Sequence, residues 1–486
     1  MKNDMGKVKL KITLLFVFFA CTIHFVSGQQ NNSLYFLDRV PQSIQLNPAL
    51  QPGCVFYFGI PVISSLEINA GNNFFGLNDA FFKDNELGKF VNALNTKEST
   101  TQALNKLRKN NIISAGINLD LISFGFKLRD SYISFLISDK VNINTNIPKD
   151  LIRLPLEVID VGSRYSLDNI GLNASYYREY SIGYSKKIND QLFFGVRGKM
   201  LFGKANITSQ QTSINIYEPN WQSIELSSSI NVQSSIPHLD VYTDKTGKPD
   251  SLNFRNFPNT SNLINDVVLL RKNRGFGFDL GIQFLPGEKF SISASILDLG
   301  YINWKTNVNT LSGGGDYTFK GINLNETNNV AKGILDSLLN VYDATLSYNP
   351  YNTLLIPKLY VAVSYAPVKS VKFGLLSRSE YIFNTFRQQF TGTLTLYPVQ
   401  FLGVNLSYTI ANRMYDNLGI GFVFRSGPLQ YYIMSERIPV MWYKIKGDNV
   451  PYLPVYAKDF NLRFGANIVI GANKHKALTK DQPFLE

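Results

Sequence analysis

Few side chains in this sequence have the type and spacing that catalysis requires. The chain holds 3 histidines, of which His238 and His475 lie in polar connections far from its N-terminal leader. It contains no Gly-x-Ser-x-Gly elbow, no His-x-x-x-His pair and no Cys-x-x-Cys. A lipase-like Ser–His pair would have to draw on His238, and no Asp-x-Asp-x-Asp-Gly calcium loop occurs. We therefore expect no enzymatic activity, no catalytic residues, no cofactor and no metal site.

Polar residues of a different kind alternate with apolar ones near the C-terminus. Between residues 459 and 471 the apolar side chains fall on one face of a strand read at period two, with Val469 as an exception. The other face carries Asn461, Arg463 and Asn467. Residues 275–284 repeat the pattern, with Asp279 on the polar face. The stretch 459–471 is longer than an ordinary strand of about five or six residues and meets the roughly 9–11 that a tilted transmembrane strand needs.

These polar candidates have two readings. Asp279, Asn461, Arg463 and Asn467 would face the lumen of a membrane β-barrel. There they would either form a polar network that fills a closed barrel or line a path for a solute. The sequence leaves both readings open.

Composition restricts the class of protein. The chain has 486 residues, of which 44% are hydrophobic, 13% aromatic and only 17% charged. Beyond the N-terminus no apolar run approaches the roughly 20 residues of a transmembrane helix. The remaining candidates are a soluble all-β protein and an outer-membrane barrel. The scattered basic residues form no basic helix or basic–aromatic motif, so we expect no binding of nucleic acid.

The N-terminus has the features of a secretory signal peptide over residues 1–28. Lysines precede the apolar run 12–20, and Val26-Ser27-Gly28 supplies the small residues that a signal peptidase reads. An uncleaved anchor and a lipoprotein at Cys21 are weaker alternatives. Cleavage near Gly28 would leave Cys54 as the sole cysteine and lower the formal charge from +12 to +9, with 44 basic against 35 acidic residues. This excess would suit contact with anionic lipopolysaccharide.

Loop lengths favour the barrel. From Cys54 onward, connections alternate between short turns, such as 129–131, 286–288 and 398–400, and long segments, such as 147–170 and 301–355. Bacterial barrels have short periplasmic turns and long extracellular loops. We therefore predict an all-β fold: a transmembrane antiparallel up-and-down barrel over 54–472 with about 14 strands, or 16 if the hairpin 207–236 enters the wall. The strand 459–471 should close it against the first strand near Val55–Phe58.

A few short extracellular helices are also expected. Apolar spacing predicts helices over 78–94 and 326–343, with a shorter one over 101–110. The two longer ones would either cap the barrel or present a docking surface to a partner. Residues 29–53 are irregular because Pro48, Pro52 and Gly53 interrupt regular structure.

Short motifs carry a resemblance to a known group of barrels. Asn47-Pro48-Ala49 near the mature N-terminus resembles the motif of the long-chain fatty-acid transporter superfamily, which includes the PorV-like and PorP/SprF-like barrels of Bacteroidota secretion and gliding systems. Asn303-Trp304 and the segment 273–281 are similar to an uncharacterised Bacteroidota family in this group. The resemblance implies about 14 strands, a plug or hatch formed by residues 29–53, and no agreed substrate. In contrast to an aromatic-terminated barrel, this chain continues into a polar tail, 473–486, expected in the periplasm.

The expected function is gated passage of small molecules, hydrophobic ones among them, across the outer membrane. The alternative is a non-transporting scaffold for secretion, gliding or surface-protein machinery. Expected partners are outer-membrane lipid and lipopolysaccharide, with periplasmic or surface proteins in the second case. A lumen packed shut by large side chains would favour the scaffold, and an apolar pocket beneath Asn47 and Pro48 would favour transport.

Overall fold

The computed structural model describes residues 26–27, 32–74, 81–83, 90–92, 97–154, 156, 161–209, 212–220, 223–243, 245, 249–255, 269, 271–319, 345–411, 414–438, 442–444, 452–454 and 459–471. The signal peptide predicted over 1–28 lies outside these ranges except for β1 (Val26–Ser27), and the tail 473–486 lies outside them entirely. No helix within the described ranges is long and apolar enough to span a lipid bilayer.

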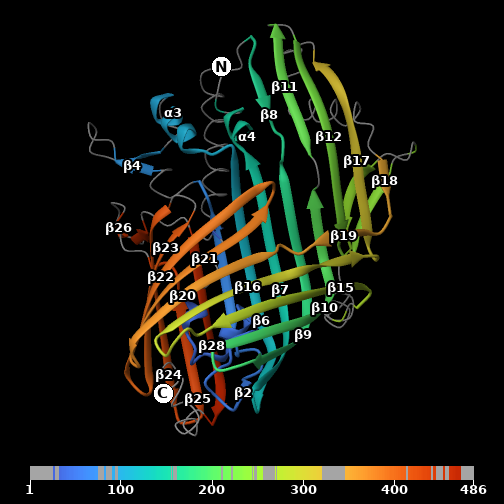
Figure 1. Cartoon of the computed structure of the whole chain (residues 1–486). Coiled ribbons are helices and arrows are strands. Elements are labelled where there is room, and N and C mark those ends of the chain that lie inside the picture. The colour runs from blue at the N-terminus through green and yellow to red at the C-terminus, as the bar shows by residue number, and fades with distance from the viewer. Residues whose placement is uncertain are drawn as a thin grey trace.

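Antiparallel strands close into a 14-stranded barrel, as alternation and loop lengths predicted. The first wall position is shared by β2 (Phe56–Gly59) and β3 (Leu66–Asn72), and another by β19 (Tyr351–Leu354) and β20 (Lys358–Val368). The other wall strands are β6 (Asn110–Leu128), β7 (Ser131–Pro148), β9 (Gly171–Lys187), β10 (Leu192–Ser209), β15 (Asn273–Phe284), β16 (Phe290–Trp304), β21 (Val371–Ile382), β22 (Thr385–Val399), β23 (Leu402–Ala411), β24 (Met414–Ser426), β25 (Leu429–Ser435) and β28 (Asp459–Ile470). Figure 1 shows these strands in order around the wall.

The last strand closes the barrel on the first. In β28, Ile470 lies opposite Phe56 and Ile468 opposite Phe58, while β2 continues the sheet into β6. On its other side β28 pairs with β25. The predicted pairing of the strand 459–471 with the chain near Val55–Phe58 is confirmed, and the closed sheet leaves no free edge in the wall.

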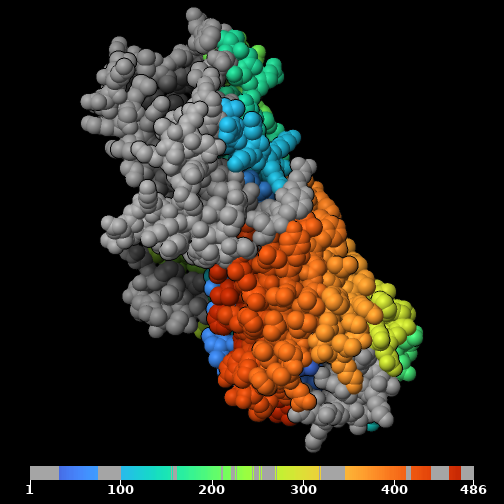
Figure 2. Space-filling model, turned by 90° about the vertical axis from the view of Figure 1, so that its left-hand side faces the viewer, coloured from blue at the N-terminus to red at the C-terminus, as the bar shows by residue number. Residues whose placement is uncertain are grey.

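The distribution of polar side chains is the reverse of that in a soluble protein: polar side chains point into the barrel and apolar ones point outward. Along β28, Asn461 and Asn467 are fully buried, whereas Ile470 is 53% exposed. Large apolar side chains form an exposed belt on the outside; it includes Ile182, Phe194, Phe276, Val361, Leu375, Phe390, Phe422 and Ile433. Figure 2 shows the outer face of the C-terminal strands, coloured orange to red, to which several of these residues belong. This is the pattern of a membrane-spanning barrel.

One side of the wall is much taller than the other. The strands β6, β7, β9 and β10 have 19, 18, 17 and 18 residues, against roughly 9–11 for crossing a bilayer. Above the belt they join further strands: β8 (Arg164–Ser166), β11 (Ser213–Asn220), β12 (Ser223–Ser235), β17 (Val308–Phe319) and β18 (Thr345–Ser347). Figure 1 shows this raised sheet at the end opposite the short turns. Hydroxyl groups of Ser213 and Ser166 bind Asp168 there and hold its pKa below the usual value.

The hairpin 207–236 extends an existing strand and adds none to the wall. From Leu192 to Gly203, β10 pairs with β15 in the barrel, but from Asn206 to Ser209 it pairs with β12. A register shift between Gly203 and Ala205 separates the two parts. Of the two strand numbers left open by the sequence, the barrel therefore has the smaller.

Several predicted connections contain strands instead. The long connection expected over 301–355 includes the end of β16, β17 and β18, and the loop over 237–273 includes the hairpin of β13 (Leu239–Thr243) and β14 (Pro249–Phe254). The strands β13, β14, β17 and β18 were missed because they pair outside the membrane wall, where no alternation of oily and wet faces marks them. The range 301–355 also hid the end of β16 and β19, which pair with each other in the wall. A further pair, β26 (Trp442–Lys444) and β27 (Tyr452–Pro454), lies in the last long connection.

The helix predictions were only partly right. The range 78–94 contains β4 (Phe81–Lys83) and β5 (Phe90–Asn92), which pair with each other, so the predicted helix was wrong. Phe and Val favour strands, and this preference prevailed over the helical spacing. The helix expected over 101–110 is α3 (Lys97–Lys106), followed by β6 from Asn110, and α4 (Lys149–Arg153) was not predicted. The helix predicted over 326–343 lies outside the described residues.

The exposed belt can be tested on β21. Leu375 is 69% exposed on the outer face. Its replacement by arginine is expected to lower the free energy of unfolding of the barrel by about 2–4 kcal/mol, the cost of a lipid-facing arginine at the bilayer midplane. Urea unfolding of the barrel in lipid vesicles measures this loss. In the matched control, Ile188→Arg in the turn after β9, the loss should be about 0–1 kcal/mol because a charge near the interface reaches water. Equal losses for both variants would contradict this assignment of the membrane belt.

Candidate functional site

The lumen is occupied near the short turns by residues 32–53, which we call the plug. Its two 3-10 helices, η1 (Asn32–Phe36) and η2 (Pro41–Gln45), are almost entirely buried. The proline at the start of η2 fits a first helical position, where no N–H is needed. Arg39 Nη1 donates to the Gln400 carbonyl at 3.2 Å and Gln51 Nε2 to the Asp130 carbonyl at 3.1 Å, both in short turns. These contacts place the plug at the short-turn end.

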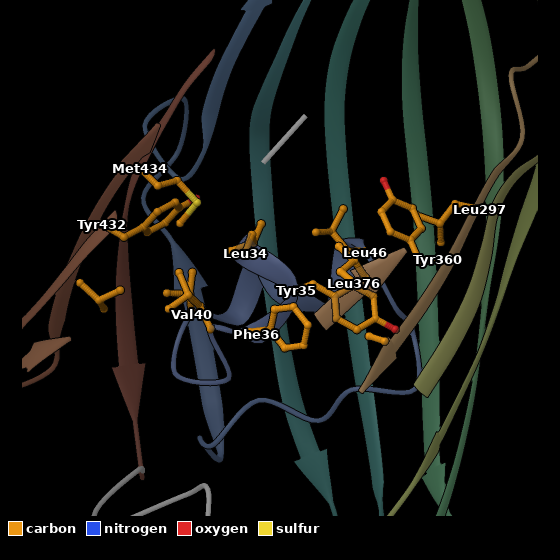
Figure 3. Packing of buried hydrophobic residues seen from close by; sticks show 13 residues of the cluster. Leu34, Tyr35, Phe36, Val40, Leu46, Leu297, Tyr360, Leu376, Tyr432 and Met434 are labelled. Carbon is orange, nitrogen blue, oxygen red and sulfur yellow. The ribbon is translucent and has the colours of Figure 1, made fainter. Parts of the chain in front are cut away.

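Apolar side chains of the plug pack against an apolar ring of the wall. Figure 3 shows Leu34, Tyr35, Phe36, Val40 and Leu46 of the plug among wall residues from several strands. The wall residues of this cluster are Leu297, Tyr360, Ala362, Leu376, Val423, Tyr432 and Met434. The ring of Tyr35 stacks on that of Tyr360 with centroids 6.0 Å apart. Burial of this apolar surface holds the plug against the wall here.

The Asn-Pro-Ala motif lies within the plug. Asn47 is fully buried, and its Oδ1 accepts a hydrogen bond from the Ala49 N–H at 2.9 Å. Its Nδ2 donates to the Tyr35 hydroxyl at 2.8 Å and to the carbonyls of Ile282 and Ala294 at 3.4 Å. Asn47 thus satisfies both ends of its amide and ties the turn of the plug to β15 and β16.

Two glycines of the wall allow the motif to approach this closely. Gly195 on β10 and Gly281 on β15 lie opposite each other in the sheet. A Cβ atom at Gly281 would lie 2.1 Å from Asn47 Oδ1, and one at Gly195 would lie 2.1 Å from the Pro48 carbonyl carbon and oxygen. These are backbone or firmly bonded groups, so any side chain at either glycine would displace the plug.

Two of the predicted lumen residues on β28 bind the plug directly. Arg463 donates from Nη2 to Gln45 Oε1 at 2.5 Å, and its Nη1 lies 3.5 Å from Glu67 Oε2. Asn467 and Gln42 exchange two hydrogen bonds: Gln42 Nε2 to Asn467 Oδ1 at 2.6 Å and Asn467 Nδ2 to Gln42 Oε1 at 3.0 Å. A reciprocal amide pair of this kind fixes the position of η2 against the wall.

Asp279, the third predicted residue, is the centre of a buried ion-pair cluster. Its side chain is completely buried and pairs with Arg197 Nη1 at 3.0 Å and Lys199 Nζ at 2.7 Å. The backbone N–H of Asp298 also donates to Asp279 Oδ1 at 2.7 Å. Asp298 has a positive φ of 62°, which marks an irregularity of β16 at this level.

Arg197 connects this cluster to the plug. Besides its ion pair, it donates from Nη1 to the Gln45 carbonyl at 3.2 Å and from Nη2 to the Ile44 carbonyl. The carbonyls at the end of η2 need such partners because they have none within the helix. The predicted residue Asp279 therefore acts on the plug through Arg197, without touching it.

The cluster continues across the lumen. Lys199 Nζ lies 2.5 Å from Asp298 Oδ1, Lys358 Nζ lies 2.6 Å from Asp298 Oδ2, and Lys140 Nζ lies 2.6 Å from Glu179 Oε2. Opposite charges alternate, so each charge of this cluster has a counter-ion, as burial of charge requires. These five groups belong to five different strands, β7, β9, β10, β16 and β20, and brace the wall above the plug.

Two polar chambers lie in line above the plug. The inner chamber has about 710 Å³ of empty space, solvent at its open side included, and is bordered by Gln45 and Leu46 of the plug and by the charged cluster. The outer chamber has about 790 Å³ on the same basis. The two share the lining residues Asn142, Tyr177, Asp298 and Lys358. The fourth predicted residue, Asn461, is fully buried opposite Asn69, a lining residue of the outer chamber.

Four residues of the site, Gln42, Gln45, Arg197 and Lys199, were not predicted. A usable signal was present for two of them: residues 195–199 alternate in the same way as 275–284, with Arg197 and Lys199 on the polar face. For Gln42 and Gln45 no periodic signal exists because the plug is irregular. Their role depends on contacts with strands far away in the sequence.

The arrangement provides binding and closure of the lumen. Among the described residues no group of three or more His, Cys, Asp and Glu side chains is placed to hold a metal ion. Cys54 is buried beside the Tyr132 hydroxyl at 3.7 Å. What the geometry offers is a polar lumen stopped by a plug that is attached through non-covalent contacts.

Comparison with known proteins gives one family. Residues 48–436 match the model of a family described as "Family of unknown function (DUF5723)". No curated protein matches the sequence.

Similar solved structures include the toluene transporter TbuX of Ralstonia pickettii, with 7% identity, a TM-score of 0.40 and coverage of 88% of this chain and 94% of that one. The Pseudomonas putida toluene transporter TodX has 7% identity and a TM-score of 0.35, with 88% and 92% covered. A Pseudomonas aeruginosa FadL homologue has 10% identity and a TM-score of 0.36, with 92% and 99% covered.

Proposed function

The chain belongs to the family of unknown function DUF5723, and from its own geometry we propose that it passes small molecules, hydrophobic ones included, across the outer membrane when the plug moves. In this proposal residues 1–28 are removed on export, residues 29–53 act as the gate and residues 473–486 lie in the periplasm. Outer-membrane lipid surrounds the exposed belt, and lipopolysaccharide is attracted by the excess of basic over acidic residues in the chain.

The observation that carries the proposal is the way in which the lumen is closed. Strand side chains do not fill it throughout, because two chambers remain above the plug. The stop is a separate segment of chain, held by hydrogen bonds such as that between Gln42 and Asn467 and by the cluster around Tyr35. Contacts of this kind can be exchanged for water or ligand without unfolding the barrel.

Hydrophobic molecules are included because of what the plug covers. Its apolar side chains pack on the wall ring that contains Leu297, Leu376 and Met434. Movement of the plug would leave this ring facing the passage, and an apolar solute could replace the lost contacts. The chambers above the ring are polar and offer an apolar solute few favourable contacts. Such a solute would therefore have to be small, so that little apolar surface meets the polar lining.

The alternative is a scaffold for secretion, gliding or surface-protein machinery. The raised sheet of β8, β11, β12, β17 and β18 is the observation in its favour. A solute passage does not need this sheet, whereas a partner protein could use it as a platform.

Reconstitution separates the two functions. In liposomes of outer-membrane lipid, the purified full chain is expected to admit small solutes and toluene-sized molecules faster than protein-free liposomes do. Purification from native membranes in mild detergent, with mass spectrometry of bound molecules, is the second arm. Absence of flux, combined with stoichiometric protein partners, would replace transport with the scaffold.

A further inference from the structure

The outer chamber is lined by an arginine whose Nε/Nη2 edge has no hydrogen-bond partner in the part of the chain that the structure describes. Arg387 on β22 is 6% exposed and lines the chamber. Both of its contacts with described residues leave from Nη1: an ion pair with Glu380 Oε1 at 3.0 Å and a hydrogen bond to Ser114 Oγ at 3.3 Å. Its Nε is buried and makes no hydrogen bond in the part of the chain that the structure describes. A buried donor without a partner costs free energy and calls for an explanation.

The geometry of the guanidinium group indicates which ligand could accept hydrogen bonds from this edge. Nε and Nη2 present two parallel N–H groups, the fork that binds both oxygens of a carboxylate. Glu380 cannot supply them, because it already pairs with Arg378 Nη2 at 2.6 Å and with Arg387 Nη1. A carboxylate on a ligand in the chamber is the group that fits.

Charges around the chamber leave room for one anion. Its charged lining residues are Lys358, Arg378 and Arg387 against Asp298 and Glu380. Asp298 pairs with Lys358 and also with Lys199. The lining therefore carries one more positive than negative charge, which a singly charged carboxylate would neutralise.

The facing wall carries neutral groups that both donate and accept hydrogen bonds. Asn142 and Asn144 on β7 lie opposite Ser175 and Asn173 on β9, and Asn69 is nearby on β3; all five line the chamber. An amide side chain matches a hydroxyl group, which also donates and accepts. A wall of such groups selects a ligand rich in hydroxyls over a purely apolar acid.

We propose that the outer chamber is a binding site for a small hydrophilic carboxylate that bears several hydroxyl groups, the chemistry of an acidic sugar. The carboxylate lies on the Nε/Nη2 edge of Arg387, and the hydroxyls face the wall of Asn142, Asn144 and Asn173. An acyl chain does not fit in the same way, because the route inward from the chamber passes Asp298 and Lys358. As a route for such a solute the site rests on the proposed function, but binding itself does not.

Titration of the detergent-purified full chain tests the site. By calorimetry, D-glucuronate should bind, while D-glucose and octanoate should bind at least about tenfold more weakly, because one lacks the charge and the other the hydroxyls. Arg387→Gln should weaken glucuronate about tenfold or more, since it removes the charged fork. Arg255→Gln, at an exposed arginine paired with Asp240 outside the barrel, is the matched control and should leave binding unchanged.

Three outcomes would overturn the site: no binding of glucuronate, equal binding of octanoate, or unchanged binding in the Arg387 variant. Asn144→Leu is a second variant, which leaves the charge of the site intact. It should weaken the binding of glucuronate and leave the migration of the folded barrel in a gel unchanged. Flux in liposomes is measured separately. Binding without flux would keep the site and remove the transport function, whereas flux without binding would do the reverse.

Discussion

Gly281→Val is expected to unseat the plug and to raise the passage of small solutes about 5- to 150-fold. The Cβ atom that this variant introduces would lie 2.1 Å from Asn47 Oδ1 and 2.9 Å from the Ala49 nitrogen. Forcing atoms into a packed interior costs about 1–3 kcal/mol, and this difference in free energy corresponds to the stated range in the population of the open state. Liposome flux of a small sugar measures the change.

The wall strand itself provides the control. Gly198 lies on β10, as Gly195 does, but a Cβ atom there would have nothing within 4 Å. Gly198→Val should therefore leave flux at the level of the unaltered chain, whereas Gly195→Val should act like the Gly281 variant. New protease cleavage within residues 32–53 should accompany the gain. Unchanged flux with an intact, protected plug in the Gly281 variant would show that the wall accommodates the side chain.

The barrel was predictable because apolar and polar side chains alternate along each membrane-crossing strand, one face toward lipid and the other toward the lumen. In β28 the alternation of Phe460, Leu462 and Phe464 with Asn461 and Arg463 needs no knowledge of the rest of the chain. Closure of the barrel followed from the lengths of the connections, which alternate only if strands run up and down. Both signals are local or nearly so, and both survive in a single sequence.

Strands above the membrane lack this alternation of apolar and polar side chains. The strands β12 and β17 pair along their length, but water surrounds that part of the molecule and no lipid-facing side has to be apolar. Their position depends on where β10 changes partners: it pairs with β15 as far as Gly203 and with β12 from Asn206, next to a register shift in its pairing with β9. A shift of this kind depends on three-dimensional packing, so the hairpin 207–236 could not be placed from the sequence.

The candidate site was predictable only in its wall half. Face assignment placed Asp279, Arg463 and Asn467 toward the lumen, but their partners Arg197, Gln45 and Gln42 come from distant parts of the chain. Such pairs arise from the way the barrel closes around the plug. Asp298 shows the same limit, since its positive φ at an irregular position of β16 turns it into the cluster.

The ion pairs above the plug have a structural cost that burial makes large. Arg197, Lys199 and Asp279 are nearly or completely buried, so each would be strongly unfavourable alone. Together they satisfy one another, and through Arg197 they also satisfy carbonyls of the plug. Stability of the wall and seating of the gate are thus coupled in one cluster, and removal of its central acid should affect both.

Asp279→Ala is therefore expected to destabilise the folded barrel by about 3–5 kcal/mol, because it leaves the buried Arg197 without its counter-ion and removes one of the counter-ions of Lys199. Urea unfolding in lipid vesicles, followed by the change in gel migration, measures the loss. Asp190→Ala provides the matched control: Asp190 also pairs with a lysine, Lys187, but its side chain is 92% exposed, so its unfolding midpoint should not move.

The triple variant Arg197→Met, Lys199→Met and Asp279→Leu makes the test specific. It replaces the buried charges with apolar groups, and replacement of a whole buried ion-pair group is often neutral or stabilising. Asp298 and the plug carbonyls would lose partners in this variant, so we expect recovery of part of the loss rather than all of it. A triple variant less stable than Asp279→Ala would contradict this expectation. It would show that the contacts of the two cations with the plug and with Asp298 contribute more to stability than removal of their unpaired charge gains.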